Sequence, residues 1–468
     1  MTRRILPPVI AVAAALLVLA APAGAEVTEK TFRYGPITVD GYEVKQSDFS
    51  LDVPKPDVDG FITSMDVDVT DADGTPVPIS RLMLHHIVFS TLGRKDNTCD
   101  KYTLLDSKTK VPAVAERFNA AGEERMRLRL PPGYGYPVKA SDRWLMTWML
   151  MNHRKQSDAA YISYRVTYDT SPSLIAAKPI WMDVRNCRAD PVYSVPGGGR
   201  PGSTHSVTST WTPPENGRII AGGGHVHGGG KSLVVSQPGC NNRTIAASRP
   251  TWGLRSHPFY SVRPILHEPG PINMTGFTSR QGFPVTAGRP VKLTSNYDAQ
   301  LPHTRVMGIY QMFFVPDASV TNACAPFPTD VRTYRSSQRG RSLAPRFTVP
   351  LTGLNRNGQA VTIARPPGAT VNLASGSTID VASHFFSRPN VRVRSGSTLR
   401  WRFGSQSLHN VTLASGPRGF ASNHLNGGRT YAARFNVPGT YKLFCALHPV
   451  SMTETVTVPM PARRRRPA

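Results

Sequence analysis

The sequence is short of acidic residues and of long apolar runs. Only 30 of its 468 residues are Asp or Glu, against 55 Lys or Arg, so the formal net charge is +25. Charged residues make up 18% and apolar residues 40% of the chain, which excludes a disordered, charge-driven protein. No apolar run of 18 or more residues follows residue 25, so we expect no membrane span beyond that point.

Helical patterns of a dozen residues are also absent after the N-terminus, although a short helix would fit around 111–119. The chain instead contains 39 Gly and 42 Pro with many Val, Thr and Ser residues, a mixture that favours short strands and turns. The period-two alternation of Ile162, Tyr164, Val166 and Tyr168 is typical of a strand. We therefore expect an all-β protein.

The first 25 residues have the pattern of a signal peptide. Arg3 and Arg4 precede an apolar core over 9–20, and a small-residue cleavage site ends at Ala25. We expect cleavage after Ala25 and a secreted, extracytoplasmic protein. A basic protein outside the cytoplasm meets anionic envelope polymers rather than nucleic acid, so we expect no nucleic-acid partner.

Turn-rich stretches divide the rest of the chain into three predicted domains. These domains cover 26–173, 174–324 and 351–458. An Arg-rich linker is expected over 325–350 and a basic tail over 459–468. The even spacing of strands and turns in the last domain is typical of a small β-sandwich.

The five cysteines cannot all pair with one another. An oxidising compartment favours two disulfides among Cys99, Cys187, Cys240 and Cys324, in any of three connectivities. Cys99 is alone in the first predicted domain, so a full pairing requires one bridge between domains. Cys445 is left over, and its neighbours explain why.

The last domain contains the donor set of a type 1 copper site. Such a site needs one thiolate, two imidazoles and a weak axial thioether. Cys445, His448 and Met452 share one loop after an apolar strand, and His409 lies on an earlier strand. The sequence therefore predicts one type 1 copper held by these four residues.

Residues at about 376–458 resemble the plastocyanin-like cupredoxins. Besides the four ligands, the similar positions are Phe386, Pro389, Val393, Gly396, Leu399, Trp401, Gly439 and Tyr441. The resemblance implies a Greek-key β-sandwich and electron transfer with a redox partner protein or a small reductant. His384 and His424 are expected to lie at the surface or just outside the ligands.

The first two predicted domains contain three histidine motifs. His225 and His227 share one face of a strand, so their rings can converge on one ion, and the glycines around them leave room for a ligand or substrate. His85 and His86 are adjacent and point to opposite faces unless the strand twists or ends there. A single histidine, His153, closes an apolar strand.

In this order the motifs resemble copper type II, ascorbate-dependent monooxygenases, the peptidylglycine-hydroxylating and dopamine β-hydroxylating enzymes. The similar stretches within about 30–324 are 84–89, 149–153, 174–183 and 303–310. The resemblance implies two tandem jelly-roll-like β-sandwich domains. It also implies one mononuclear copper in each domain, facing the other across a solvent-filled cleft.

The resemblance assigns the ligands of both coppers. The electron-delivering copper would be held by His85, His86 and His153. The catalytic copper, which would bind O2 and hydroxylate a C–H bond of a small organic substrate, would be held by His225, His227 and Met307. Met312 is the competing thioether. The peptide-amidating branch has a basic residue just before the His-x-His motif, where this chain has Gly223 and Gly224, so a glycyl-peptide substrate is not expected.

Three functions follow from these patterns. The first is a copper redox protein whose type 1 copper passes electrons, in place of or besides ascorbate, to a monooxygenase core. The second is a non-catalytic electron-transfer or copper-holding protein with an inert monooxygenase-like scaffold. The third is an envelope protein that binds acidic polymers through its basic surface. The ordered set of candidate ligands argues against the third, and copper count and dioxygen reactivity distinguish the first two.

Overall fold

The structure is a computed structural model that describes residues 26–461 apart from 100–102, 106–111, 189, 255 and 336–339. The predicted signal peptide, and the basic tail beyond residue 461, lie outside these residues. In the described part, regular structure consists of strands, a four-residue helix α1 (Pro258–Ser261) and a 3-10 turn at Pro238–Cys240. The all-β expectation is confirmed. No helix in the described part is long and apolar enough to cross a membrane.

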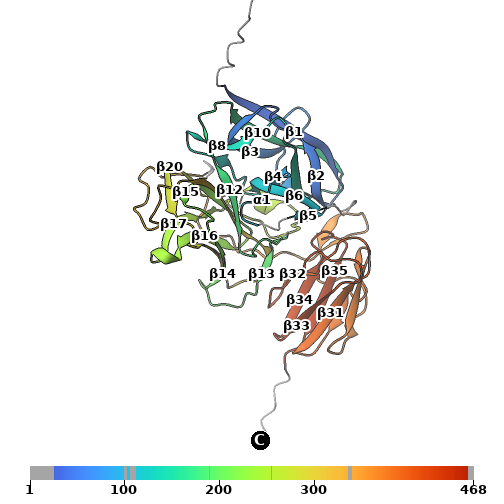
Figure 1. Ribbon diagram of the computed structural model, residues 1–468. Coiled ribbons are helices and arrows are strands. Elements are labelled where there is room, and N and C mark those ends of the chain that lie inside the picture. The colour runs from blue at the N-terminus through green and yellow to red at the C-terminus, as the bar shows by residue number, and fades with distance from the viewer. Residues whose placement is uncertain are drawn as a thin grey trace, which may run out of the picture.

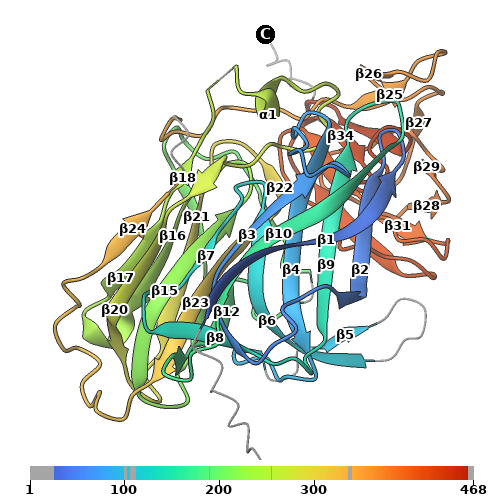
Figure 2. The ribbon, with the colours of Figure 1, turned by 90° about the horizontal axis from the view of Figure 1, so that it is seen from above.

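The N-terminal domain consists of two sheets packed around one apolar core (Figure 2). One sheet has the order β1 (Val27–Val39), β10 (Asp158–Asp169), β3 (Gly60–Thr70), β8 (Tyr134–Val138) and β11 (Ile175–Ala176), with β7 (Leu128–Arg129) paired to β3. The other has the order β2 (Val44–Val53), β9 (Trp144–Asn152), β4 (Leu82–Leu92), β6 (Pro112–Gly122) and β5 (Thr103–Leu105). The alternating side chains Ile162, Tyr164, Val166 and Tyr168 of β10 all join the core, as their spacing predicts.

The helix expected around 111–119 is wrong in the part that the structure describes, because β6 occupies it and pairs antiparallel with β4. Ala, Glu and Arg favour helices, but Phe118 and Ala121 are buried in the core, and this packing outweighs local propensity. A register shift opposite Phe89 and Ser90 interrupts the pairing. The period-two pattern that would have identified the strand is lost there.

The second domain is a further sandwich of two sheets. One has the order β12 (Lys178–Asp183), β23 (Gly308–Pro316), β15 (Gly217–Val226), β20 (Gly276–Val285) and β24 (Arg332–Tyr334). The other has the order β14 (Thr204–Trp211), β21 (Val291–Asp298), β16 (Gly230–Gln237) and β17 (Arg243–Ser248). Two short ladders join β13 (Tyr193–Val195) to β22 (His303–Val306) and β18 (Pro250–Thr251) to β19 (Asn273–Met274).

The first two domains share a core. Ile220 and Phe313 of the second domain belong to the apolar cluster of the first, whereas Ile219 and Phe314 face the core of their own domain. β15 and β23 are therefore buried on both faces, which is why they read as nearly continuous apolar runs. This packing fixes the relative position of the histidine motifs in the two domains.

The C-terminal domain is a separate sandwich set against the other two (Figure 1). One sheet has the order β27 (Val371–Asn372), β30 (Asn390–Arg392), β35 (Thr453–Val458), β34 (Gly439–Phe444) and β32 (Thr412–Ser415). The other has the order β29 (Phe385–Phe386), β28 (Thr378–Ala382), β31 (Ser397–Phe403) and β33 (Thr430–Phe435). A hairpin of β25 (Thr352–Leu354) and β26 (Ala360–Thr362) precedes them.

The stretch expected as a linker is partly built into the second domain. Its strand β24 extends the sheet of β20, and Arg341 forms a bridge with Trp252. Phe327 also packs against the second core. The connection to the C-terminal domain is therefore anchored over much of its length.

The four pairing cysteines form two disulfides. Cys99 bonds to Cys187, with Cα atoms 5.6 Å apart, and Cys240 bonds to Cys324, with Cα atoms 5.4 Å apart. The first bond joins the two N-terminal domains, as the uneven distribution of cysteines requires. Cys445 is free and buried.

Candidate metal centres

The ligand loop, residues 445–452, connects β34 and β35, which pair antiparallel up to its two ends. Cys445 N–H donates to the carbonyl oxygen of Met452 (3.0 Å), and His448 N–H donates to that of Cys445 (3.0 Å). Met452 N–H donates in turn to the carbonyl oxygen of His448 (3.0 Å). These bonds close a tight turn that holds three potential ligands at one end of the sandwich.

The donor atoms of this loop and of His409 have the spacing of a metal site. His409 Nδ1 lies 3.2 Å from His448 Nδ1, and His448 Nδ1 lies 3.5 Å from Cys445 Sγ. Nitrogens about 2.0 Å and sulfur about 2.3 Å from one ion, at these separations, subtend angles of about 105° and about 110° at the ion. Met452 is fully buried beside Cys445 in the core of the domain. The residues therefore fit a copper ion.

Burial shifts the pKa values of the same residues in the directions that matter for metal binding. Burial raises the pKa of the Cys445 thiol. Burial, with the neighbouring His409 second, lowers the pKa of His448 to about 4, and burial lowers the pKa of His409. Asn410 N–H donates to Cys445 Sγ (3.4 Å), and Ala446 N–H donates to Asn410 Oδ1 (2.7 Å). Both imidazoles are thus neutral donors, and the thiol loses its proton only when metal binds.

Two further histidines lie beside this site. His384 is exposed, with its ring centroid 4.5 Å from that of His448. His424 is more enclosed, and its Nε2 has no hydrogen-bond partner in the described part of the chain. Burial, with the charge of Arg305 second, lowers the pKa of His424 to about 3. The converging donor set comprises His409, Cys445 and His448 and leaves both of these residues outside.

In the first domain, β4 carries His85 and His86 at a β-bulge. The pairing of β4 with β9 shifts register between Leu84 and His86, so that His85 is the extra residue. A bulge lets consecutive side chains turn toward the same side of a strand. The two ring centroids are 5.4 Å apart. Adjacent side chains of a regular strand point to opposite faces, and the bulge lets His85 and His86 reach the same site despite being adjacent.

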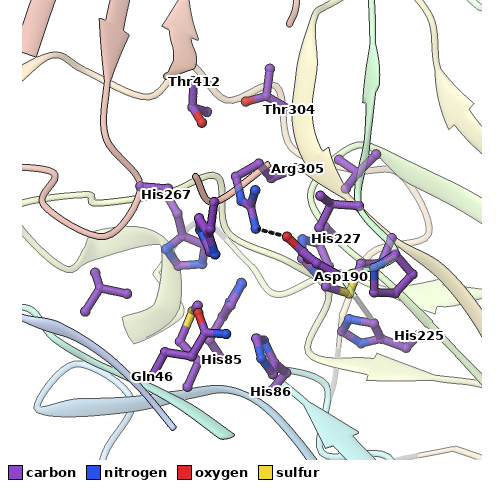
Figure 3. Close-up of a pocket in the computed structure, with 18 of the residues that line it drawn as sticks. Gln46, His85, His86, Asp190, His225, His227, His267, Thr304, Arg305 and Thr412 are labelled. Atoms are coloured by element: carbon purple, nitrogen blue, oxygen red, sulfur yellow. Dashed lines mark hydrogen bonds and ion pairs between the residues drawn. The ribbon is translucent and has the colours of Figure 1, made fainter. Parts of the chain in front are cut away.

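Histidines of both N-terminal domains meet in one place. His225 lies near the end of β15 and His227 just after it, with ring centroids 5.0 Å apart. The ring of His85 lies 5.0 Å from that of His227 and 5.0 Å from that of His267. We call the following residues the interdomain histidine cluster: His85, His86, His153, His225, His227 and His267. Figure 3 shows five of them around one side of a cavity.

The cluster differs from the two separated sites that the monooxygenase resemblance implies. No solvent-filled cleft separates His85 from His227, because their rings are in contact. The ring of His153 lies 6.3 Å from that of His267. Among the described residues, a set of three donors within 4.8 Å of one another here comprises His85, Glu123 and His267, not His85, His86 and His153.

The structure separates the two candidate thioethers. Met307 falls between β22 and β23 and lines the cavity together with His225 and His227. Met312 is buried in the core of the second domain. Met307 therefore lies where a metal ligand of the cluster could lie. Met312 does not, because its side chain is in the core.

A carboxylate that the sequence patterns missed connects the two domains at the cluster. Glu123 Oε1 lies 2.6 Å from His85 Nδ1 and 2.6 Å from His267 Nε2. Glu123 Oε2 accepts a hydrogen bond from Gly270 N–H (2.7 Å). Burial acts to raise the pKa of Glu123, but His267 and His85 outweigh it and hold this pKa well below its usual range.

Two other carboxylates repeat this arrangement. Glu124 Oε2 accepts from His225 Nδ1 (2.9 Å), and a carboxylate oxygen of Glu268 lies 2.8 Å from His303 Nδ1. Burial lowers the pKa of His225, but Glu124 more than compensates and raises it. A carboxylate on one ring nitrogen fixes the tautomer and leaves the other nitrogen free for metal, an arrangement typical of metal-binding histidines.

The cluster contains buried nitrogens without hydrogen bonds in the described part of the chain: His86 Nδ1, His153 Nε2, His225 Nε2, His227 Nε2 and His267 Nδ1. Burial, with His85 second, lowers the pKa of His86 to about 3, and burial, with His267 second, lowers that of His153 to about 4. A buried donor or acceptor without a partner costs about 1–3 kcal/mol. Unpaired imidazole nitrogens gathered this closely fit a copper or zinc ion.

The glycines around His225 and His227 accommodate side chains of the protein itself, and two of them, Gly223 and Gly228, also line a cavity, as expected. A Cβ atom at Gly228 would lie 2.3 Å from Glu268 Cγ, and one at Gly229 would lie 2.2 Å from His303 Cε1. A Cβ at Gly122 would lie 2.5 Å from His225 Cε1. The glycines therefore make room for the protein's own side chains.

The C-terminal domain is docked on an apolar patch of the first two domains that adjoins the cluster at Leu266. Leu447 and Val450 of the ligand loop pack on an apolar patch formed by Val44, Met83, Met149, Met151, Phe259, Tyr260 and Leu266. Thr304 Oγ1 donates to the carbonyl oxygen of Leu413 (2.9 Å), and Arg418 donates to that of Gly197 (2.7 Å). The copper ligand loop thus lies at the interface between the domains.

A cavity of about 990 Å³ lies between the cluster and the C-terminal domain. Its walls include His86 and His227 on one side and His424 and Ala446 on the other. Arg305, which has a positive φ of 53°, bonds to Asp190 (2.8 Å) and to the carbonyl oxygen of Ser422 (3.3 Å) across this space. The cavity is large enough for a small organic molecule.

The sandwich and its ligand loop together define a copper-binding β-sandwich domain. Residues 375–459 match the family of copper binding proteins described as the plastocyanin/azurin family. The C-terminal domain therefore belongs to the plastocyanin/azurin family of copper-binding cupredoxins.

Curated relatives are similar to the same part of the chain. Amicyanin-alpha of Methylorubrum extorquens is 37% identical over 79 residues, which are 16% of this chain and 66% of amicyanin-alpha. Amicyanin of Paracoccus versutus is 29% identical over 92 residues, 19% of this chain and 70% of that protein. The chain therefore spans slightly less than two thirds of amicyanin-alpha.

Solved structures of amicyanin are also similar to part of this chain. A reduced amicyanin mutant is 28% identical, over 17% of this chain and 79% of its own, with a TM-score of 0.16. The Cu(I) form of another amicyanin mutant is 27% identical, over 17% of this chain and 79% of its own, with a TM-score of 0.17.

Sequence patterns missed His267, Glu123, Glu124 and Glu268. His267 follows α1 in an irregular segment, without a histidine neighbour that would have marked it. Glu123 and Glu124 form an adjacent acidic pair directly after β6, in a chain with few acidic residues. This acidic pair was the sequence feature that could have identified the carboxylates of the cluster.

Proposed function

We propose that the chain is a secreted copper redox protein in which a type 1 copper exchanges electrons with copper held by the interdomain histidine cluster. The type 1 ligands are His409, Cys445, His448 and Met452. The observation that carries the proposal is the packing of Leu447 and Val450, which flank His448, on the patch that contains Leu266. Leu266 immediately precedes His267 of the cluster.

The docking supports electron exchange within one molecule. The ligand loop and the cluster are separated by packed apolar side chains, without an intervening layer of solvent at this contact. A buried apolar contact also keeps the two sites at a fixed separation. External electrons would then come from a redox partner protein or a small reductant.

We further propose that the cluster supports copper-dependent hydroxylation of a small organic substrate by O2. Copper at the cluster would supply dioxygen activation. The protein would contribute the cavity that binds the substrate, with His225, His227 and Met307 in its wall and Arg305 across from them. The order of the histidine motifs, and the position of Met307 in that wall, support this assignment.

A second candidate is a non-catalytic electron carrier or copper-holding protein on an inert scaffold. It is favoured by the absence, among the described residues, of a converged donor set from His85, His86 and His153. The curated amicyanin relatives also match only 16% and 19% of this chain. In this case, the cavity would have no substrate to turn over.

Electron exchange between the two sites is tested by disturbing the docking contact. Val450→Asp places a charge in the apolar patch, whereas Val437→Asp changes a 37% exposed valine of the same domain. After rapid photoreduction of the type 1 copper, we expect its blue absorption to return by electron transfer to Cu(II) in the cluster. The rate should fall at least tenfold in Val450→Asp and remain unchanged in Val437→Asp. Equal rates in both variants would contradict the proposal.

A further inference from the structure

We infer that His267 is a metal ligand of the interdomain histidine cluster and that Glu123 is the residue that positions it. The inference rests on the proposed function, since it names a ligand for the copper of that cluster. No sequence motif points to His267, which lies between α1 and β19 in an irregular segment. The spatial arrangement alone brings it to the site.

The ring of His267 stands between the predicted ligands of the first domain. Its centroid is 5.0 Å from that of His85 and 6.3 Å from that of His153. Its Nδ1 is buried and has no hydrogen-bond partner in the described part of the chain. His267, from the second domain, and His153, from the first, therefore each offer a buried nitrogen without a partner among the described residues, on rings whose centroids are 6.3 Å apart.

Glu123 positions the imidazoles and does not bind the metal itself. Its Oε1 lies 2.6 Å from both His85 Nδ1 and His267 Nε2. Two donors about 2.0 Å from one ion and 2.6 Å apart would subtend only about 80°, too narrow for separate ligands of one ion. The distance is instead that of a charge-assisted hydrogen bond. Each ring therefore donates to Glu123 and turns its other nitrogen away from the carboxylate.

The second carboxylate oxygen of Glu123, Oε2, is also fixed by a hydrogen bond. It accepts from Gly270 N–H (2.7 Å), and a Cβ atom at Gly270 would lie 2.7 Å from the same oxygen. The carboxylate thus bonds to one residue of its own domain and two of the second domain. Fixed in this way, it sets the tautomers of His85 and His267 together, as outer carboxylates do in metal sites.

His267 is also the cluster residue next to the docked ligand loop. Leu266 is buried in the patch on which Leu447 and Val450 pack. A ligand at position 267 would connect the metal of the cluster to that patch through a single peptide unit. The same residue would hold metal and receive electrons from the C-terminal site.

Metal retention tests the inference. The full-length protein is stripped of metal, loaded with Cu(II), desalted and measured for total copper, for the EPR signal outside the type 1 spectrum, and for blue absorption. The variants are His267→Ala and Glu123→Gln, and the control is His205→Ala on β14, outside the cluster. We expect His267→Ala to retain cluster copper at least tenfold more weakly and Glu123→Gln about 10–100-fold more weakly. His205→Ala should match the unmodified protein, and blue absorption should be unchanged in all three.

A measurement on the unmodified protein covers the case in which a variant does not fold. Deuterium exchange at the histidine Cε1–H, followed residue by residue by mass spectrometry, should slow at His267 when copper is bound. Unchanged exchange at His267, or full copper retention with an unaltered EPR signal in a folded His267→Ala variant, would overturn the inference and leave the proposed function standing. If the unmodified protein retains only the type 1 copper, the inference about His267 and the proposed function of the cluster are both wrong.

Discussion

At the scale of single residues, hydrogen bonds decide which atoms are free to bind metal. Glu123, Glu124 and Glu268 each occupy one ring nitrogen of a histidine and leave the other bare. At the C-terminal site, Asn410 bonds to both Cys445 and Ala446 and so fixes the thiol against the ligand loop. Chemistry at both sites depends on these few contacts as much as on the ligands.

Copper binding at the C-terminal site should release one proton from Cys445. Burial raises the pKa of this thiol, whereas His448, with a pKa of about 4, is already neutral. Copper affinity should therefore fall about tenfold per pH unit between pH 8 and pH 5, and more steeply below about pH 4. Titrations against a competing chelator, read from the blue absorption, measure this dependence. An affinity independent of pH over this range would be inconsistent with the structure.

At the scale of elements, strand ends and bulges create the sites. The bulge at His85 on β4, the end of β15 at His225 and the β34–β35 turn each place donors where the ladder is interrupted. The same interruptions make their geometry hard to infer. The sequence allowed His85 and His86 to share one metal only at a twist or an end of the strand, because a bulge leaves no mark in the residue types.

Regular elements were predictable, and contacts between domains were not. The ligand loop could be read because Cys445, His448 and Met452 are consecutive in one motif. β4, β9 and β10 could be read from apolar runs and alternation. The sequence could not predict that the histidines of the first and second domains meet in one cluster, because this contact depends on β15 and β23 packing against the core of the first domain. Glu123 was overlooked because the strand before it has helix-favouring residues.

Glu454 on β35 should make the C-terminal domain less stable as pH rises. It is fully buried, and burial, opposed only by the hydrogen bond from Trp401, raises its pKa to about 8. A carboxyl whose pKa is raised on folding favours the folded state fully below the unfolded value of about 4.5 and loses that benefit up to about pH 8. Glu454→Gln, which keeps the acceptor for Trp401, should raise stability at pH 7 by roughly 3 kcal/mol. Thermal unfolding followed by tryptophan fluorescence should show no such gain at pH 4.5, and an equal gain at both pH values would be inconsistent with a raised pKa of the buried Glu454 carboxyl.

Gly122→Ala should weaken the cluster without removing a ligand. The new Cβ would lie 2.5 Å from His225 Cε1 and 2.6 Å from a carboxylate oxygen of Glu124. Displacing this pair should lower cluster copper affinity at least tenfold and leave the blue absorption unchanged. Gly404→Ala, whose nearest neighbour is 3.9 Å away, is the matched control. Copper retention equal to the control would show that His225 does not contribute to the site.

At the scale of the whole molecule, the three domains are packed together as one unit. The first two share a core and the Cys99–Cys187 disulfide, and the third packs its ligand loop on both of them. Each of the first two domains alone lacks part of the cluster, and neither contains the ligand loop. Assembly is therefore a condition of the proposed function.

The interdomain disulfide should support the cluster, and the intradomain one should not. Replacing both Cys99 and Cys187 by Ser should cost about 4 kcal/mol of stability and reduce copper retention at the cluster. The Cys240–Cys324 disulfide closes a loop of similar length, with a sequence separation of 84 against 88, so replacing both of its cysteines by Ser should cost a similar amount. Copper retention in this second double variant should stay normal. Equal copper loss in the two double variants would indicate a general effect of stability.

The central claim is that one chain binds type 1 copper and, at the interdomain histidine cluster, further copper. Spin-quantified EPR of the mature protein, loaded with Cu(II) and freed of excess metal, tests it most directly. The account predicts one signal with the narrow hyperfine splitting of a type 1 site and at least one further spin per chain from copper with imidazole ligands. A single type 1 spin with no other copper retained would contradict the account and leave an electron-transfer domain on a scaffold without metal.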